Sequence, residues 1–368
     1  MKILAIETSC DETAIALVEA SGGLPRPRFK ILENLVASQI KIHAPFGGVV
    51  PNLAKREHLK NLPLLWQRIM NNELGIRNKK SASKTITHNS KFIIPKIDLI
   101  CVTVGPGLEP ALWTGIEFSK ELYSKLKTQN PKLKLIGVSH LSGHLYSFLL
   151  PSDKESLKSY GLNLKSLFPA IALIVSGGHT SLLLMKSLTS IKKIGETRDD
   201  AVGESFDKVA RLLGLPYPGG PQIEKISKDG NPLAIEFPRP MIHQKNFDFS
   251  YSGLKTSVLY YLRDNKDADM ADVAASFRQA AFDVLIKKTF RAAREFKARS
   301  IMVSGGVSAS RELRKRFNKE TKKSAKIKLL IPDLGFSTDN AAMIAAAGYI
   351  NFLRKKNHKL EANGNLQI

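Results

Sequence analysis

Two histidines four residues apart, His140 and His144 in the stretch HLSGH, have the spacing of a metal site. This spacing places both imidazoles on one face of a helix, within reach of one ion. Metalloproteases use the same spacing with a glutamate after the first histidine, but Leu141 stands there in this chain. Two imidazoles and one carboxylate leave open coordination positions, which suits Fe²⁺ or Zn²⁺. The alternative is that one histidine caps the helix and the other is exposed.

The third ligand must come from a distant part of the chain. Asp339 is the best carboxylate, because it opens the Ala-rich segment 337–356, where small side chains allow a close approach. Spacing alone leaves this pairing open. Ser337 or Thr338 is the expected N-cap of the helix that follows. The tail after it, residues 358–368, is expected to be loose.

Glycine pairs follow apolar segments at three places, VSGGH (175–179), YPGGP (217–221) and VSGGVS (303–308). Glycine lets the backbone approach a ligand closely, and the exposed N–H groups of such turns suit phosphate. None of the three matches the P-loop or the dinucleotide-binding pattern, which disfavours both of those classes. The three turns together favour a nucleotide-like ligand, although each glycine pair could serve only a tight turn.

Carboxylates gather in two segments. Asp11 and Glu12 lie at the tip of the first expected hairpin, where acidic residues are also ordinary turn formers. A denser group precedes the YPGGP turn and comprises Asp199, Asp200, Glu204 and Asp207. A carboxylate at either place could accept hydrogen bonds from a ribose or a substrate amine.

Composition narrows the partners and the compartment. The chain has 368 residues, a formal net charge of +23 and a pI of about 9.9. Such a surplus favours a polyanion, with nucleic acid the natural candidate, although evenly spread lysines would give the same total. Only two cysteines, Cys10 and Cys101, are present, which suits a reducing compartment. With no apparent presequence and no apolar run of membrane-spanning length, we expect a cytoplasmic protein without membrane contact.

The chain is organised as two similar halves. Segments 2–20 and 170–187 both read as strand, polar turn and strand, as if one unit were used twice. Helical spacing covers 51–75, and strands are expected at 30–43 and 97–107. We therefore predict an α/β duplication with a cleft between two lobes.

The N-terminal lobe is predicted to span residues 1–150, with an inserted basic loop at about 76–96. The C-terminal lobe is predicted to span 151–368, with a spacer at about 151–166. Its final helix, from about 338, is expected to return to the cleft.

Ten motifs between residues 2 and 350 resemble, in the same order, the bacterial TsaD-type tRNA threonylcarbamoyladenosine transferases. They are ETSCDET (7–13), GGVVP (47–51), VGPGL (104–108), HLSGH (140–144), VSGGHT (175–180), DDAVGESFDK (199–208), YPGGP (217–221), DFSYSGLKT (248–256), SGGVSASRELR (304–314) and STDNAAMIA (337–345).

This resemblance implies the duplicated actin/Hsp70-like fold, which is ribonuclease H-like in each lobe. It also implies transfer of a threonylcarbamoyl group from threonylcarbamoyl-AMP to N6 of the tRNA adenosine 3′ of the anticodon, in tRNAs that read codons beginning with A. One divalent metal, most often iron, is implied as cofactor. The implied protein partners are a TsaB-like paralogue and a small TsaE-like ATPase.

The resemblance also implies roles for individual residues. His140, His144 and Asp339 match the metal ligands, and Asp11 and Glu12 match the acidic residues near the reacting centre. The residues that match the adenylate and substrate contacts are Ile174, Val175, Ser176, Gly177, Gly178, Asp207, Gly220, Glu224 and Ser310. Ser310 stands where the family usually has asparagine, and Asn52 stands where it usually has glutamate.

The implied reaction is an acyl transfer to an exocyclic amine, a poor nucleophile. A cation could polarise the carbonyl, the glycine turns could hold the AMP phosphate, and Glu12 or Asp11 could accept the proton from N6. Two alternative functions remain open. An ATP-dependent small-molecule kinase would share the glycine turns but would not need the histidine pair, and a non-catalytic tRNA-binding subunit would need only the positive charge.

Overall fold

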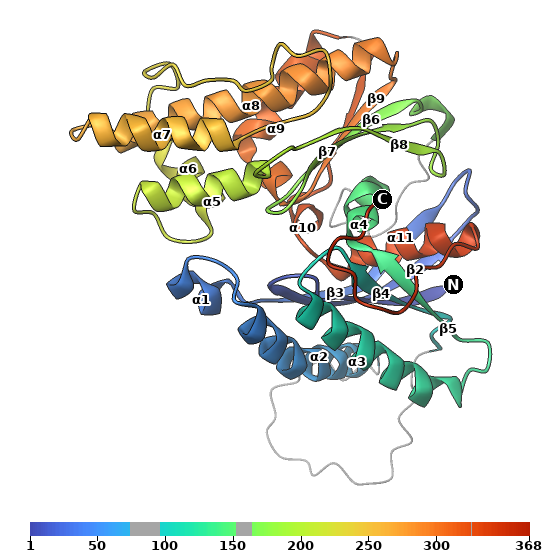
Figure 1. The fold of residues 1–368 in the computed structure, drawn as a ribbon. Coiled ribbons are helices and arrows are strands. Elements are labelled where there is room, and N and C mark those ends of the chain that lie inside the picture. Colours follow the sequence, from blue (N-terminus) through green and yellow to red (C-terminus); the bar gives the residue numbers. More distant parts are fainter. Residues whose placement is uncertain (74–95, 152–163, 325) are drawn as a thin grey trace.

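The computed structural model describes residues 1–73, 96–151, 164–324 and 326–368 (Figure 1). The expected spacer 76–96 lies outside the described residues except for residue 96, and the expected spacer 151–166 lies outside them except for residue 151 and the 3-10 helix Leu164–Ser166. Within the described part of the chain, the strands form two five-stranded sheets.

The first sheet has the strand order β3-β2-β1-β4-β5. β1, β2 and β3 pair in antiparallel fashion, whereas β4 and β5 run parallel to β1. These strands are β1 (Lys2–Glu7), β2 (Glu12–Ser21), β3 (Arg28–Ser38), β4 (Leu99–Gly105) and β5 (Lys134–Ser139). β3 ends earlier than the predicted strand 30–43, because the chain turns there into the short helix α1 (Ile40–His43).

The second sheet repeats this arrangement. Its order is β8-β7-β6-β9-β10, with β6, β7 and β8 antiparallel and with β9 and β10 parallel to β6. The strands are β6 (Ala170–Val175), β7 (Thr180–Met185), β8 (Ile191–Glu196), β9 (Ser300–Ser304) and β10 (Lys328–Leu330). Each strand of the first sheet therefore has a counterpart at the same position in the second, and the predicted duplication is confirmed.

Helices cover both sheets. α2 (Pro51–Glu73) and α3 (Glu109–Lys127) pack on the outer face of the first sheet and share one hydrophobic core with it (Figure 1). The outer face of the second sheet packs against a group of helices that includes α5 (Val202–Leu212), α7 (Ser252–Asp264) and α8 (Met270–Glu295). α6 (Gly219–Ile226) and α9 (Arg311–Lys322) contribute residues to the same core.

Two helices occupy the space between the sheets. α4 (His140–Tyr146) and α11 (Ala341–Leu353) belong to one core cluster that includes residues of β1, β2, β6 and β7. The sequence of α11, AAMIAAAGYINFL, is apolar on nearly all sides, as expected for a helix buried all round. The last helix thus returns to the first sheet, two hundred residues after that sheet is complete in the sequence.

The start of α11 differs from the prediction. Asn340 is the N-cap, and its side chain accepts a hydrogen bond from the N–H of Met343 at 3.0 Å. Ser337 instead ends the short helix α10 (Leu334–Ser337), and Thr338 follows it as that helix's C-cap. Asp339 therefore lies in the link between two helices and is not occupied with capping either one.

The prediction that the C-terminal tail is loose is wrong. His358 forms an isolated bridge with Gly137, and the N–H of Asn363 donates to the carbonyl of Val104 at 2.9 Å. Leu360 and Leu366 are partly buried against the core of the first sheet. These backbone contacts and the apolar residues spaced through a polar segment hold the tail against β5 and the end of β4. Among the residues that the structure describes, no helix has the length and apolar character needed to cross a membrane.

The closeness of α11 to the first sheet can be tested at Gly348. A Cβ at this position would lie 2.2 Å from Sγ of Cys101, so Gly348→Ala must displace the helix. We expect the substitution to lower the free energy of unfolding by about 1–3 kcal/mol, measured by urea denaturation. Gly253→Ala in α7 is the matched control, because its Cβ would meet nothing within 4 Å. Equal stability of the Gly348→Ala variant and the wild type would contradict the packing described.

Candidate metal centre and adenylate site

The local structure of α4 presents both histidines on one side. β5 ends at Ser139, which caps α4 by accepting a hydrogen bond from the N–H of Ser142 at 3.5 Å. His140 opens the helix and His144 follows one turn later, with side chains that are 8% and 0% exposed. Gly143 lies against α11, where a Cβ would come within 3.0 Å of Met343 and Ile344. The glycine thus allows the two helices to approach closely.

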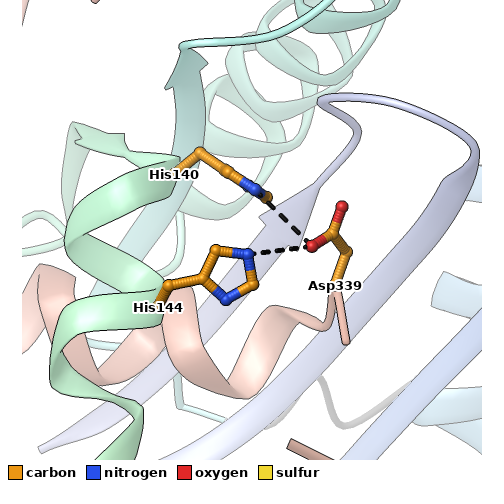
Figure 2. A group of neighbouring side chains, drawn as sticks. All are labelled: His140, His144 and Asp339. Carbon is orange, nitrogen blue, oxygen red and sulfur yellow. Dashed lines mark ion pairs between the residues drawn. The ribbon is translucent and has the colours of Figure 1, made fainter. Parts of the chain in front are cut away.

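Asp339 meets both histidines. Its Oδ1 lies 3.5 Å from Nε2 of His140 and 3.1 Å from Nε2 of His144. One ligand atom from each of the three residues lies within 4.8 Å of the others. Figure 2 shows the two rings projecting from α4 toward the carboxylate. The convergence that spacing left open is therefore present in the fold.

The residues of this cluster fit a divalent metal ion. Both ring nitrogens of His144 are buried, and among the described residues neither makes a hydrogen bond of good geometry; the 3.1 Å approach of Nε2 to Oδ1 of Asp339 is a close polar contact. Buried polar atoms without a partner cost free energy, which a coordinated ion would recover. Two imidazole nitrogens with one carboxylate oxygen form a donor set suited to Fe²⁺ or Zn²⁺. The donor set does not distinguish between these two ions.

The buried carboxylate of Glu7 orients the ring of His140 by contacting Nδ1, whereas Nε2 faces Asp339. Its Oε2 lies 3.1 Å from Nδ1 of His140 and accepts a hydrogen bond from the hydroxyl of Thr103 at 2.6 Å. Its Oε1 accepts the N–H of Ser9 at 2.5 Å. An imidazole that donates Nδ1–H to a carboxylate keeps its Nε2 lone pair for a metal. Sequence reasoning missed Glu7, although a glutamate ending the apolar strand KILAIE was a usable signal.

The charges of the cluster shift several pKa values. Burial lowers the pKa of His140, but the charges of Asp339 and Glu7 outweigh it and raise the pKa to about 9. Burial favours protonation of Asp339, but the charge of His140 and the contact with His144 lower its pKa to about 2. Without metal, His140 is therefore protonated at neutral pH and forms ion pairs with both carboxylates.

The acidic turn lies beside this cluster. Burial raises the pKa of Glu12 well above its ordinary value, and the charges of Asp339 and Asp11 raise it further. Burial and then the charge of Asp11 also raise the pKa of Tyr217, in the YPGGP turn. The fold thus brings the predicted acidic residues close to both the histidine cluster and the second glycine turn.

The first glycine turn also faces the cluster. Burial lowers the pKa of His179, and the charges of His140 and His144 lower it further, to about 4. A Cβ on Gly177 or Gly178 would meet nothing within 4 Å, so the space above both glycines is open.

The hydroxyl of Ser176 accepts the N–H of His179 at 3.1 Å and closes this turn. Ile174 and Val175 are fully buried in β6, so they could offer a ligand only their backbone.

Asp207, Glu224 and Ser310, which are also predicted to contact the substrate, accept hydrogen bonds from backbone N–H groups of the protein. Asp207 accepts the N–H of Gly219 at 2.7 Å, which fixes the YPGGP turn, and a Cβ on Gly220 would point into open space. Glu224 accepts the N–H of Arg311 at 2.8 Å at the start of α9. Ser310 caps the same helix by accepting the N–H of Leu313 at 3.3 Å. Contact of Asp207, Glu224 or Ser310 with an adenylate stays a prediction.

Two other members of the acidic group are tied to their surroundings. Asp199 accepts hydrogen bonds from the hydroxyls of Ser250 and Ser252 and from the N–H of Tyr251. Asp200 accepts a hydrogen bond from Nζ of Lys208 at 2.7 Å. The contacts of Asp199 fasten the DFSYSGLKT segment to the loop before α5, and that of Asp200 fastens the same loop to α5 itself. Asn52, where the family usually has glutamate, is exposed in the first turn of α2.

Two sheets of the same topology, with a histidine–aspartate cluster that could hold a metal ion between them, define a duplicated two-lobe α/β fold of the actin-like type. The crystal structure of T. kodakarensis HypF is similar in fold, with a TM-score of 0.53, 14% identity, and coverage of 96% of this chain and 49% of that one. Residues 30–346 match the family model TsaD, tRNA N6-adenosine threonylcarbamoyltransferase, and the chain belongs to this family.

Relatives with this name match along nearly the whole chain. The tRNA N6-adenosine threonylcarbamoyltransferase of Thermosipho africanus is 46% identical and is covered over 100% of both chains. That of Moorella thermoacetica is 42% identical, with 98% of this chain and 95% of the relative covered. The resemblance found in the sequence motifs is therefore confirmed at the level of the family.

Metal binding should depend on pH because His140 must lose its proton to coordinate. We expect the apparent affinity of the metal-free protein for Zn²⁺ to rise about tenfold per pH unit below the His140 pKa of about 9. Calorimetry in two buffers of different ionisation enthalpy should detect about one proton released at pH 7. The free energy of unfolding of the metal-free protein should show the opposite trend. Protonated His140 stabilises the fold fully below pH 6.5, and this contribution is lost as the pH rises through about 9.

One variant tests this assignment and a second serves as its control. His140→Gln should weaken Zn²⁺ binding and remove the proton release. His243→Gln changes an exposed histidine outside the cluster and should behave as the wild type. Zn²⁺ binding to the wild type at pH 7 without proton release would contradict the charge state assigned to His140.

Proposed function

We propose that this chain transfers the threonylcarbamoyl group from threonylcarbamoyl-AMP to N6 of the tRNA adenosine 3′ of the anticodon, in tRNAs that read codons beginning with A. The observation that carries the proposal is the full-length match to transferases of this name together with the buried His140, His144 and Asp339 cluster. Each relative reported above carries the transferase name, and the kinase alternative receives no support from them.

The adenylate would bind at the first glycine turn. Open space above Gly177 and Gly178 leaves their backbone free to approach a phosphate, which is the leaving group of the reaction. Asp207 and Gly220 in the second turn would contact the ribose, with Glu224 and Ser310 at the edge of the site. Ile174 and Val175 would support the turn as the end of the strand that leads into it.

His140, His144 and Asp339 would hold one divalent ion, Fe²⁺ in preference to Zn²⁺. When bound, such an ion supplies a Lewis acid that stabilises negative charge on an oxygen of the substrate. Glu7 would keep His140 in the tautomer that coordinates. The three metal ligands and Glu7 would therefore be positioned by α4, the link before α11 and the end of β1.

Glu12 or Asp11 would accept the proton that leaves N6. A carboxylate whose pKa is raised by burial and by neighbouring charge is a stronger base than an exposed one. N6 is a poor nucleophile, so removal of its proton and correct placement of both substrates would carry much of the acceleration.

The remaining partners follow from the family and from charge. A net charge of +23 suits attraction of the tRNA phosphates. A TsaB-like paralogue and a TsaE-like ATPase are the proposed protein partners, and the cytoplasm is the proposed compartment. The proposed lobes are residues 1–150 and 151–368, with the final helix packed on the first.

A single-turnover reaction tests the function directly. The purified chain, with its partners where turnover needs them, is mixed with preformed threonylcarbamoyl-AMP and unmodified tRNA, and the tRNA nucleosides are analysed by mass spectrometry. The wild type should form N6-threonylcarbamoyladenosine. Asp339→Ala and His144→Ala should lose bound metal and at least 100-fold in rate together, because each removes a ligand. His243→Ala is the control.

Two results would count against the proposal. A wild type with bound metal that forms no modified nucleoside would refute the assigned reaction. A metal-free Asp339→Ala variant that reacts at the wild-type rate would refute the role of the cluster.

A further inference from the structure

A continuous line of buried polar side chains connects the loop before α2 with the acidic turn. Its members come from β2, from the segment at α1 and from α2, and each side chain is at most 1% exposed. They are Thr13, Gln39, His43 and His58. None of them belongs to the metal cluster or to the glycine turns described above.

The hydrogen bonds of this line run in one direction. Nε2 of His58 lies 3.0 Å from the carbonyl of Cys10, which can only accept, so this nitrogen carries the proton. Burial lowers the pKa of His58, consistent with a neutral ring. Its Nδ1 then accepts from the hydroxyl of Thr13 at 2.8 Å and faces the amide of Gln39 at 3.3 Å.

The same reasoning extends the line to the loop. Oε1 of Gln39 lies 3.0 Å from Nε2 of His43 and accepts its proton. Nδ1 of His43 in turn accepts the N–H of Val50 at 3.3 Å. With both histidines neutral and protonated at Nε2, every bond in the line has one donor and one acceptor. One arrangement of protons therefore satisfies the whole network.

Both ends of the line are anchored to parts of the proposed site. At one end the acidic turn is held twice, by His58 at the carbonyl of Cys10 and by the N–H of Gln39 at the carbonyl of Asp11, 2.9 Å away. At the other end, the guanidinium of Arg211 donates to the carbonyl of Gly47 at 2.6 Å. Arg211 lies on α5, one turn after Asp207.

The acidic turn needs such a hold. Asp11, Glu12 and Asp339 crowd their negative charges, which is one cause of the raised pKa of Glu12. Repulsion between like charges favours a turn that moves away from Asp339. Hydrogen bonds to two successive backbone carbonyls oppose that movement. An apolar core would pack equally well at this place but could not fix a carbonyl.

We propose that His58 is a positioning residue for the transfer reaction, which holds Asp11 and Glu12 in place through the carbonyl of Cys10. His43 and Gln39 extend this hold to the 44–50 loop, and Arg211 connects the loop to the second half of the chain. The position of α5, and with it of the YPGGP turn, is thereby coupled to the position of the acidic turn. The inference rests on the function proposed above.

Two substitutions of His58 separate the donor from the acceptor. In His58→Gln the amide nitrogen can take the place of Nε2 and still donate to Cys10. In His58→Asn the amide can take the place of Nδ1 and accept from Thr13, but nothing reaches Cys10. We expect His58→Gln to keep the single-turnover rate within about threefold and His58→Asn to lose at least tenfold, the effect of one buried hydrogen bond.

The controls distinguish positioning from folding. Both variants lose one bond of the line, so their urea midpoints should be similar, and both should retain metal because no ligand is changed. Equal loss of rate in the two variants, or a wild-type rate in His58→Asn, would overturn the proposal. Thr13→Ser keeps the hydroxyl, so its single-turnover rate should stay within about threefold of the wild type, as expected for His58→Gln.

The coupling to the second half has its own test. Arg211→Ala should slow single turnover, and the double variant Arg211→Ala/His58→Asn should be no slower than His58→Asn alone, because both act through one line. Multiplicative effects would overturn the coupling.

A measurement without substrate separates this inference from the function itself. In the ¹⁵N-histidine-labelled protein, His43 and His58 should both give the signature of a neutral ring protonated at Nε2. A ring protonated at Nδ1 in either residue would exclude the line of hydrogen bonds, whatever reaction the chain performs. Correct tautomers in a protein that modifies no tRNA would instead count against the proposed function.

Discussion

The close contact between α4 and α11 is the constraint on which the candidate site depends. α4 follows the last strand of the first sheet and carries the two histidines. α11 begins just after Asp339, nearly two hundred residues later in the sequence. Gly143 on one helix and the nearly unbroken apolar surface of the other let the two backbones approach. The free energy that brings the two helices together thus comes largely from apolar burial between the sheets, because the desolvation of the buried charged residues offsets much of their mutual attraction.

Much of this arrangement could be predicted from the sequence. The repeated strand–turn–strand pattern predicted the duplication, because two similar segments must solve the same packing problem in the same way. The spacing of His140 and His144 predicted a common helix face, and Asp339 was placed beside small residues that allow close approach. The motifs then indicated the family. Each of these inferences uses residues that are close in sequence or that recur in a fixed order.

The features that were missed depend on contacts that sequence does not record. Glu7 lies in a strand, and only the fold shows that it points to His140 across 133 positions. Asn340 was passed over as the N-cap because Ser337 and Thr338 are equally good capping residues. The tail lacks a helical or strand period, so its packing on β4 and β5 could not be read from a pattern. The roles of Glu224 and Ser310 at α9 were likewise invisible.

The charge of the site contrasts with that of the whole chain. A net charge of +23 attracts phosphates over long distances, whereas Glu7, Asp11, Glu12 and Asp339 gather around two histidines at the centre. A phosphate is repelled by such a centre unless a cation is bound there, but an adenine amine is uncharged and is not. The same amine needs a proton acceptor, which these carboxylates provide. A positively charged chain with an acidic centre therefore suits a reaction in which RNA is attracted by its backbone and a single base enters the site.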